Sequence, residues 1–225
     1  MITASNEYGQ YCVPDGVEDR PAARAVLEGR VYEPGTIRFM RANAGQGDII
    51  HAGTFFGDFL PALSTALAPG ARLWAFEPNP VSHAAAAKTI ELNGLENVTL
   101  THAAVSDTVG ELLFQTHDKS GKPLGGLSHV VGEKGPGVES VPAVSIDSIV
   151  PEDRDVSIVQ LDVEGHIKPA LLGTRRILQK SRPLLVLEMF DKPSFFKRRF
   201  GRLGYAQTQV VNGNQVYKAG LADAE

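Results

Sequence analysis

The sequence has little cysteine, no excess of positive charge and no long apolar run, and each shortage excludes a class of protein. Cys12 is the single cysteine among 225 residues, so a scaffold held together by internal disulfides is excluded. Lys and Arg total 22 against 26 Asp and Glu, and this net charge of −4 argues against a general nucleic-acid-binding protein. No stretch reaches the roughly 18 apolar residues of a membrane helix. The opening MITASNEYGQ lacks the basic and apolar regions of a signal peptide. We expect a cytoplasmic protein with no membrane or nucleic-acid partner.

From residue 48 onward, predicted strands and helices alternate. This order is typical of right-handed βαβ units and predicts an α/β fold with a mostly parallel sheet. The turn-forming Asn212-Gly213-Asn214, between two alternating runs, predicts a terminal hairpin that adds one antiparallel strand. The expected strands span 49–53, 72–78, 98–105, 111–117, 138–146, 156–163 and 183–190, and the expected helices span 55–67, 80–93, 167–180 and 194–203.

Two regions stand outside this alternation. Residues 1–46 form a predicted N-terminal arm with short helices at 21–29 and 34–40, which could close over a substrate as a lid. Residues 118–137 are rich in glycine and predict a long loop. Pro142 predicts that its strand lies at an edge of the sheet, because proline cannot donate a hydrogen bond to a neighbouring strand.

Ligands of parallel sheets bind at the carboxyl ends of the strands, so we expect functional residues there. Gly53 and Gly57 follow the first strand of the alternation with the spacing G-x-x-x-G. This turn either lets a ligand approach the backbone closely or only packs a helix against a strand. Glu77 closes the next strand, where a carboxylate can accept two hydrogen bonds from a ribose diol. Asn79 is expected to cap the helix that begins at Pro80.

A second group of ionisable residues follows the apolar strand at 156–163. Asp162, Glu164 and His166 lie within five residues, and ending a buried strand in such groups is costly unless they are used. The alternative is that the acids only favour the dipole of the next helix. Glu188 closes the last parallel strand and is expected either to face the crevice beside Asp162 or to pair with Lys192.

Several segments together resemble the FkbM-type methyltransferases over about residues 47–190. These are AFEPNP at 75–80, ELNGLENV at 91–98, AVSD at 104–107, SIDSIV at 145–150, LDVEGH at 161–166 and RPLLVLEMF at 182–190. The resemblance implies the Rossmann-like, seven-stranded class I methyltransferase fold over residues 47–225. It also implies S-adenosylmethionine as methyl donor, S-adenosylhomocysteine as product, and a hydroxyl group on a small molecule or glycoside as acceptor. The oligomeric state stays open.

The resemblance also implies a set of cofactor-binding residues. His51 stands where the family commonly has an acidic residue, and Ala104 stands where many class I enzymes hold adenine with an acid. We therefore expect backbone and apolar groups to hold the adenine. The implied cofactor-binding residues are His51, Ala52, Gly53, Thr54, Phe55, Gly57, Glu77, Pro78, Asn79, Ala104, Val105 and Asp162.

A hydroxyl acceptor must lose a proton, which predicts a catalytic base near the reacting methyl group. The candidates are His166, Glu164 and Glu188, with Asp162 at the methyl group, and we prefer His166 because imidazole titrates near neutral pH. Some class I O-methyltransferases hold a divalent metal at positions that resemble Asp162 and Glu188. Two carboxylates make a sparse metal site, so the sequence favours a metal-free base.

Two other functions compete with an O-methyltransferase. His51 at a usually acidic position is compatible with a non-catalytic protein that binds S-adenosylmethionine on the same scaffold. A nicotinamide-dependent oxidoreductase would need a G-x-G-x-x-G turn after its first strand, and the sequence lacks one there.

Overall fold

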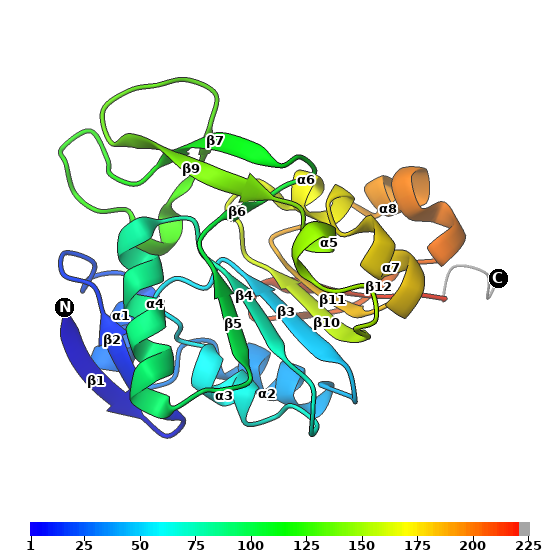
Figure 1. Cartoon of the computed structure of the whole chain (residues 1–225), viewed down its shortest axis with the longest axis horizontal. Helices are drawn as coiled ribbons and strands as arrows, with labels where there is room; N and C mark the ends of the chain where they lie inside the picture. Colours follow the sequence, from blue (N-terminus) through cyan, green and yellow to red (C-terminus); the bar gives the residue numbers. More distant parts are fainter. Residues whose placement is uncertain (221–225) are drawn as a thin grey trace.

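A computed structural model describes residues 1–220 of the chain. Its central sheet has seven strands in the order β12-β13-β11-β10-β3-β4-β5 (Figure 1). Strand β13 runs antiparallel to both of its neighbours and the other six strands run in one direction, as the sequence predicts. The strands are β3 (Asp48–Ala52), β4 (Leu73–Phe76), β5 (Val98–Thr101), β10 (Val156–Leu161), β11 (Leu184–Glu188), β12 (Ala206–Val211) and β13 (Asn214–Lys218).

Helices cover both faces of this sheet. On one face lie α2 (Pro34–Ala42), α3 (Leu60–Ser64) and α4 (Pro80–Asn93), and on the other lie α5 (Ile146–Ile149), α6 (Ile167–Leu172), α7 (Arg175–Ser181) and α8 (Pro193–Phe200) (Figure 1). Helix α4 begins as predicted, because the side chain of Asn79 accepts hydrogen bonds from the backbone N–H groups of Val81 and Ser82. It ends at Gly94, which adopts the left-handed conformation with φ 58°.

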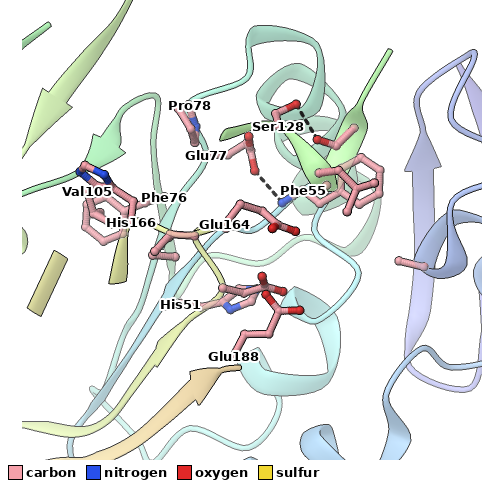
Figure 2. A pocket seen from close by; sticks show the side chains of 18 of the residues that line it. His51, Phe55, Phe76, Glu77, Pro78, Val105, Ser128, Glu164, His166 and Glu188 are labelled. Atoms are coloured by element: carbon pink, nitrogen blue, oxygen red, sulfur yellow. Dashed lines mark hydrogen bonds between the residues drawn. The ribbon is translucent and has the colours of Figure 1, made fainter. Parts of the chain in front are cut away.

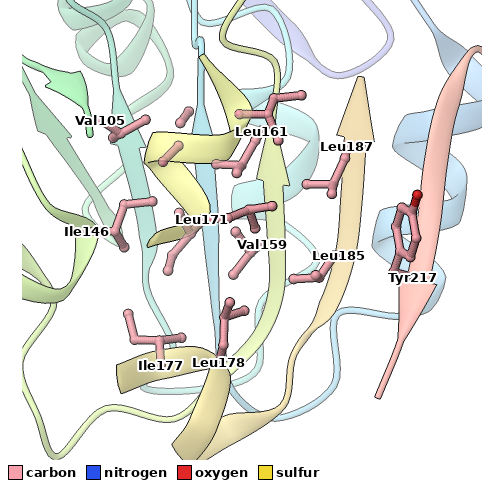
Figure 3. Packing of buried hydrophobic residues seen from close by; sticks show 14 of the residues in the cluster. Val105, Ile146, Val159, Leu161, Leu171, Ile177, Leu178, Leu185, Leu187 and Tyr217 are labelled. Carbon is pink, nitrogen blue, oxygen red and sulfur yellow. The ribbon is translucent and has the colours of Figure 1, made fainter. Parts of the chain in front are cut away.

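The central strands are apolar on both faces because each face is packed under helices. In β10, Val159 and Leu161 belong to the core under α6 and α7, where Leu171 and Leu178 meet them (Figure 3). Ile158 points the other way, into the core under α2 and α3. This double burial explains why apolar residues dominate β10 on both faces, with Ser157 and Gln160 as the exceptions.

Two predicted helices are shorter than expected. The helix predicted over 55–67 begins only at Leu60, because Phe55 and Gly57 adopt positive φ angles of 51° and 84° that a right-handed helix cannot contain. The helix predicted over 167–180 is divided into α6 and α7 at Gly173. A Cβ atom at this glycine would lie 1.9 Å from the carbonyl oxygen of Ser106, so the chain passes too close for any side chain.

Part of the predicted parallel sheet is a separate four-stranded sheet, in the order β6-β9-β7-β8. Its strands are β6 (Ala104–Val105), β7 (Gly110–Gln115), β8 (His129–Val131) and β9 (Val138–Val144), and a short 3-10 helix, η1 (Gly125–Leu127), precedes β8. The prediction of an edge strand at Pro142 is wrong, since β9 lies between β6 and β7. Strand β6 pairs only with Ala143 and Val144, so Pro142 has no strand partner on that side.

The N-terminal arm begins with a β-hairpin that the sequence analysis did not predict, formed by β1 (Ile2–Asn6) and β2 (Gly9–Val13). Helix α1 (Pro21–Leu27) and helix α2 follow near their predicted positions. The hairpin packs on α4, where the backbone N–H of Cys12 donates to Thr89 Oγ1 over 3.0 Å. Tyr11 is fully buried against Phe56. No helix among the described residues is long and apolar enough to cross a membrane.

Candidate functional site

A cavity of about 1140 Å³, counted out to its open mouth, lies at the carboxyl ends of β3, β4, β10 and β11. All four predicted catalytic residues line it: Asp162, Glu164, His166 and Glu188. Nine of the predicted cofactor-binding residues also line it, namely His51, Ala52, Gly53, Phe55, Glu77, Pro78, Ala104, Val105 and Asp162. Thr54, Gly57 and Asn79 are not among the lining residues.

The side chain of Glu77 is buried and accepts hydrogen bonds from two backbone N–H groups. Its Oε2 accepts a hydrogen bond from Phe55 N over 2.7 Å (Figure 2). Its Oε1 accepts one from Asn79 N over 2.9 Å. Burial raises the pKa of Glu77 to about 8, although these two hydrogen bonds act in the opposite direction. Glu77 therefore fixes the turn after β3 as well as facing the cavity.

Asn79 links this turn to the four-stranded sheet. Its Nδ2 donates to Ser128 Oγ over 3.1 Å, and the Ser128 hydroxyl donates to the carbonyl oxygen of Gly125 over 2.7 Å. Residues 125–128, which the sequence analysis placed in a loop, thus form one wall of the cavity. Asn79 shapes the cavity while capping α4.

Gly53 is required by the packing of the protein itself. A Cβ atom there would lie 1.7 Å from the carbonyl oxygen of Asp162, and φ is 85°. Any side chain at this position would force β3 and β10 apart. Losing ligand binding by substituting Gly53 would therefore not distinguish a cofactor turn from a packing turn.

His51 is held as a neutral imidazole at the base of the cavity. It pairs with Gln160 in the register of β3 and β10, and its Nδ1 hydrogen-bonds Gln160 Oε1. Its ring stacks on Phe59 with an angle of 6° between the planes. Burial lowers the pKa of His51 to about 4, so it carries no charge at neutral pH. Its Nε2 has no hydrogen-bond partner among the described residues.

Asp162, Glu164 and Glu188 converge beside His51 (Figure 2). One carboxylate oxygen of each lies within 4.8 Å of the others. Burial, and next the neighbouring Glu188, raise the pKa of Asp162 well above its usual range. Burial raises the pKa of Glu164 as well, and Glu188 adds to this effect. Of the two placements expected for Glu188, the structure shows the one that faces the crevice beside Asp162.

His166 lies away from these carboxylates, at the Val105 end of the cavity (Figure 2). Its Nε2 is 3.2 Å from the hydroxyl oxygen of Ser106. Burial lowers the pKa of His166 from its ordinary value, which favours the neutral form. Its role as the catalytic base stays a prediction.

Three acidic or phenolic residues that line the cavity were not predicted from the sequence as site residues. Tyr32 and Glu33 come from the N-terminal arm, and Asp58 comes from the turn after β3. Burial raises the pKa of Asp58 to about 7, and burial followed by the charge of Glu33 raises the pKa of Tyr32 to about 12. The arm had no motif to reveal Tyr32 or Glu33, whereas Asp58 directly follows Gly57 and could have been found.

Several residues at the cavity have backbones that non-glycine residues rarely adopt. Glu33, Phe55 and Glu164 line the cavity with φ angles of 44°, 51° and 31°. Met189, next to Glu188, has φ 45°. Such conformations cost free energy and gather at functional sites, where the surrounding fold enforces them. The residues with positive φ angles therefore lie at the same site as the carboxylate cluster.

The sequence matches the model of the methyltransferase FkbM domain over residues 43–207. The chain belongs to the FkbM methyltransferase family. Members of this family use S-adenosylmethionine as methyl donor, and the matched residues include the whole carboxylate cluster. No protein of curated function matches the sequence.

Solved structures share the fold at low sequence identity. A methyltransferase FkbM from Methylobacillus flagellatus is 14% identical with a TM-score of 0.51, covering 77% of this chain and 43% of its own. A methyltransferase from Geobacter sulfurreducens is 14% identical with a TM-score of 0.50, covering 90% and 87%. TYW2 from M. jannaschii, solved in complex with AdoMet, is 14% identical with a TM-score of 0.51, covering 97% and 84%. The chain thus spans less than half of the first of these and most of the other two, and it has the class I methyltransferase fold.

Proposed function

We propose that this FkbM-family protein methylates a hydroxyl oxygen of a small molecule or glycoside. The observation that carries the proposal is the group of three carboxylates, Asp162, Glu164 and Glu188, at one end of the cavity. A hydroxyl acceptor has to lose its proton as it is methylated, and carboxylates whose pKa values are raised are suited to take it. We place the methyl donor at the other end of the cavity, away from the three carboxylates.

The residues present fit S-adenosylmethionine, which when bound supplies a methyl group activated on a sulfonium ion. Glu77 can accept hydrogen bonds from ribose hydroxyls with the lone pairs that its two backbone donors leave free. Val105 and Phe76 are apolar walls for the adenine, next to His166 (Figure 2). Asp162 would then hold the sulfonium end of the donor.

In this arrangement the carboxylates hold the acceptor and take its proton. The bound donor would supply the methyl group and keep the electron pair of the broken sulfur–carbon bond, while Asp162, Glu164 and Glu188 would hold the acceptor hydroxyl and accept its proton. Positioning the acceptor oxygen about 3 Å from the methyl carbon supplies much of the rate enhancement. Because His166 lies at the adenine end, we assign the proton transfer to Glu164 in preference to His166.

Formation of S-adenosylhomocysteine, measured across a panel of hydroxylated small molecules and glycosides, tests this proposal. Once the screen has identified an acceptor, we expect E164Q to lower turnover by about 10²–10⁴-fold, which is the usual contribution of a general base. H166A is expected to change mainly the affinity for the donor.

Three results would contradict parts of the proposal. If H166A has the larger effect on turnover, the imidazole is the base. Methyl groups mapped to nitrogen or carbon in the product would reject O-methylation. Tight donor binding without any turnover would favour the non-catalytic binding protein instead.

A further inference from the structure

On the side of α2, the cavity is lined by acidic groups from two separate parts of the chain. His51 and Glu188 lie two residues after Ile49 and Val186, which belong to the core under α2 and α3, so their side chains emerge on that face of the sheet. Glu33 directly precedes α2 and lines the same cavity. The start of the helix and the end of the sheet therefore meet at the cavity, where Figure 2 shows His51 and Glu188.

The carboxyl group of Glu33 is held beside Glu188 with one oxygen left over. Its Oε2 accepts hydrogen bonds from Thr36 Oγ1 over 2.8 Å and from Asn214 Nδ2 over 2.9 Å, and its Oε1 accepts none from residues 1–220. Asn214 in β13 is the strand partner of Glu188 in β11, and the Cβ atoms of such partners lie about 4.5–5.5 Å apart. The oxygen of Glu33 that lacks a donor thus lies near a second carboxylate.

Holding Glu33 at this position costs free energy. Its φ angle of 44° is one that non-glycine residues rarely adopt. Burial raises its pKa, its two hydrogen bonds lower it, and the charge of Glu188 raises it again. No ion pair among residues 1–220 includes Glu33 or Glu188. The described residues therefore supply no positive partner for either acid.

His51 supplies a second and independent observation. Its side chain lines the cavity and is only 3% exposed, and its Nε2 has no partner among the residues that the structure describes. Because Nδ1 faces the acceptor Gln160 Oε1, it carries the proton and leaves a lone pair on Nε2. A buried acceptor without a partner is costly, which points to a ligand that donates to it.

We infer that the acceptor carries a protonated amine beside the hydroxyl that is methylated, and that Glu33, Glu188 and His51 Nε2 form an amine subsite for its ammonium group. The inference rests on the proposed function, because it concerns the acceptor of that reaction. An ammonium group has three N–H donors and no acceptor, which matches three acceptors of this kind. Glu188 also belongs to the carboxylate cluster that holds the hydroxyl, so the amine and the hydroxyl lie on neighbouring carbons, as in a 2-amino sugar.

The ammonium group of S-adenosylmethionine itself is the competing occupant, and the order of the strands argues against it. A donor with its ribose at Glu77 and its sulfonium at Asp162 lies over the ends of β4, β3 and β10. Glu188 lies one strand beyond, at the end of β11, which is about 14 Å from β4 at about 4.8 Å per strand. The amine subsite is therefore on the far side of the methyl group from the ribose.

The charge of the cavity also favours a cationic acceptor. Its described lining residues include six carboxylic acids, and burial favours the neutral form of both lining histidines. Arg20 is the one positive side chain among these lining residues, and its guanidinium donates to the carbonyl oxygen of Pro123. S-adenosylmethionine brings a single net positive charge. Donor and Arg20 together leave most of the acids without a counter-charge.

Protonation of the amine directs the methyl group to oxygen. An ammonium nitrogen has no lone pair with which to attack the methyl carbon, whereas the hydroxyl oxygen has one. The proton that leaves the hydroxyl goes to Glu164, and the amine keeps its own proton throughout.

Binding of amino sugars to the protein saturated with S-adenosylhomocysteine tests the inference without turnover. The probes are glucosamine, galactosamine and mannosamine, each compared with its N-acetyl derivative, which has the same hydroxyls and no charge. Titrations followed by ligand NMR give the dissociation constants. We expect at least one amine to bind saturably, about 10- to 100-fold more tightly than its N-acetyl derivative, which is the scale of charge-assisted hydrogen bonds.

E33Q is the decisive variant. A glutamine whose oxygen takes the place of Oε2 keeps both hydrogen bonds, so we expect E33Q to fold, which its melting temperature checks. It should lose the preference for the amine and keep the wild-type affinity for S-adenosylmethionine. H51F keeps the stack on Phe59 and lacks the Nε2 acceptor, so it should lose part of the preference. E28Q removes an exposed acid of the same arm outside the cavity and is the matched control.

Failure of all three amines to bind at tens of millimolar would overturn the inference, as would equal binding of each amine and its N-acetyl derivative. A preference that survives in E33Q would overturn it too. If E33Q weakens the donor as much as the amine, the acids serve the donor and the inference is wrong. An unchanged preference in folded H51F would overturn the assignment of His51. Amine binding by a protein that binds no S-adenosylmethionine, seen when the titrations are repeated without S-adenosylhomocysteine, would instead reject the proposed function and leave the amine subsite standing.

Discussion

At the scale of single residues, the site depends on ionisable groups that the fold keeps out of water. Glu77 is 5% exposed and its two carboxylate oxygens accept backbone hydrogen bonds from Phe55 and Asn79. The sequence predicted only that Glu77 accepts hydrogen bonds from a ribose, and these two backbone bonds give it a structural role as well. Since its removal leaves two buried N–H groups unpaired, a truncation to alanine is also expected to destabilise the free protein.

Glu77 predicts a pH dependence of stability. Its pKa is about 8 in the folded protein against 4.5 as the ordinary value, so the folded state binds its proton more tightly than the unfolded state does. Its contribution to stability is therefore complete below about pH 4.5 and is lost as the pH rises through about 8. At about 1.4 kcal/mol per pKa unit, the total is a few kcal/mol. We expect the free energy of unfolding of E77Q, measured with urea, to fall less between pH 5 and 9 than that of the wild type. Parallel curves would contradict the assignment.

At the scale of elements, the small sheet β6-β9-β7-β8 matters because it brings η1 and Ser128 to the cavity wall. A hydrogen bond from Asn79 Nδ2 to Ser128 Oγ links it to the end of β4. The core of the small sheet is slight, consisting of Ala104, Phe114 and Val141 with Leu112 and Val130 at its margin. The wall of the cavity is thus held by few contacts, and hydrogen bonds should matter more there than in the central sheet.

A substitution of Ser128 tests how strongly the cavity wall depends on hydrogen bonds. S128A removes the acceptor of Asn79 Nδ2 and the donor to Gly125, both buried, and should cost about 1–3 kcal/mol. We expect faster amide hydrogen exchange in residues 116–131 and weaker donor binding. S120A, at an exposed serine of the same loop that does not line the cavity, is the control and should leave donor binding unchanged. Equal exchange rates in the wild type and S128A would mean that the wall is held by other contacts.

At the scale of the whole molecule, the sequence predicted those parts of the fold that depend on hydrophobic periodicity and on the order of strands and helices. The parallel strands, the helix from Pro80 to Asn93 and the terminal hairpin follow from such patterns. The separate small sheet did not, because β6 has only two residues and the run 98–105 looks continuous. The site was predicted where strands end in ionisable residues, as at Asp162 and Glu188. Tyr32 and Glu33 reach the site through long-range packing of the arm, which no local pattern records.

The central claim is that the cavity binds S-adenosylmethionine with Glu77 at its ribose, and isothermal titration calorimetry tests it most directly. The titration should be made at a pH where E77Q and the wild type are both folded, with chelator present and with E96Q, an exposed glutamate outside the cavity, as the control. We predict one donor per chain in the wild type and in E96Q. In E77Q we predict an affinity weaker by about 1–3 kcal/mol, the cost of leaving a buried hydrogen-bonding group without its partner. Equal affinity in folded E77Q, or the absence of binding by the wild type, would contradict the account.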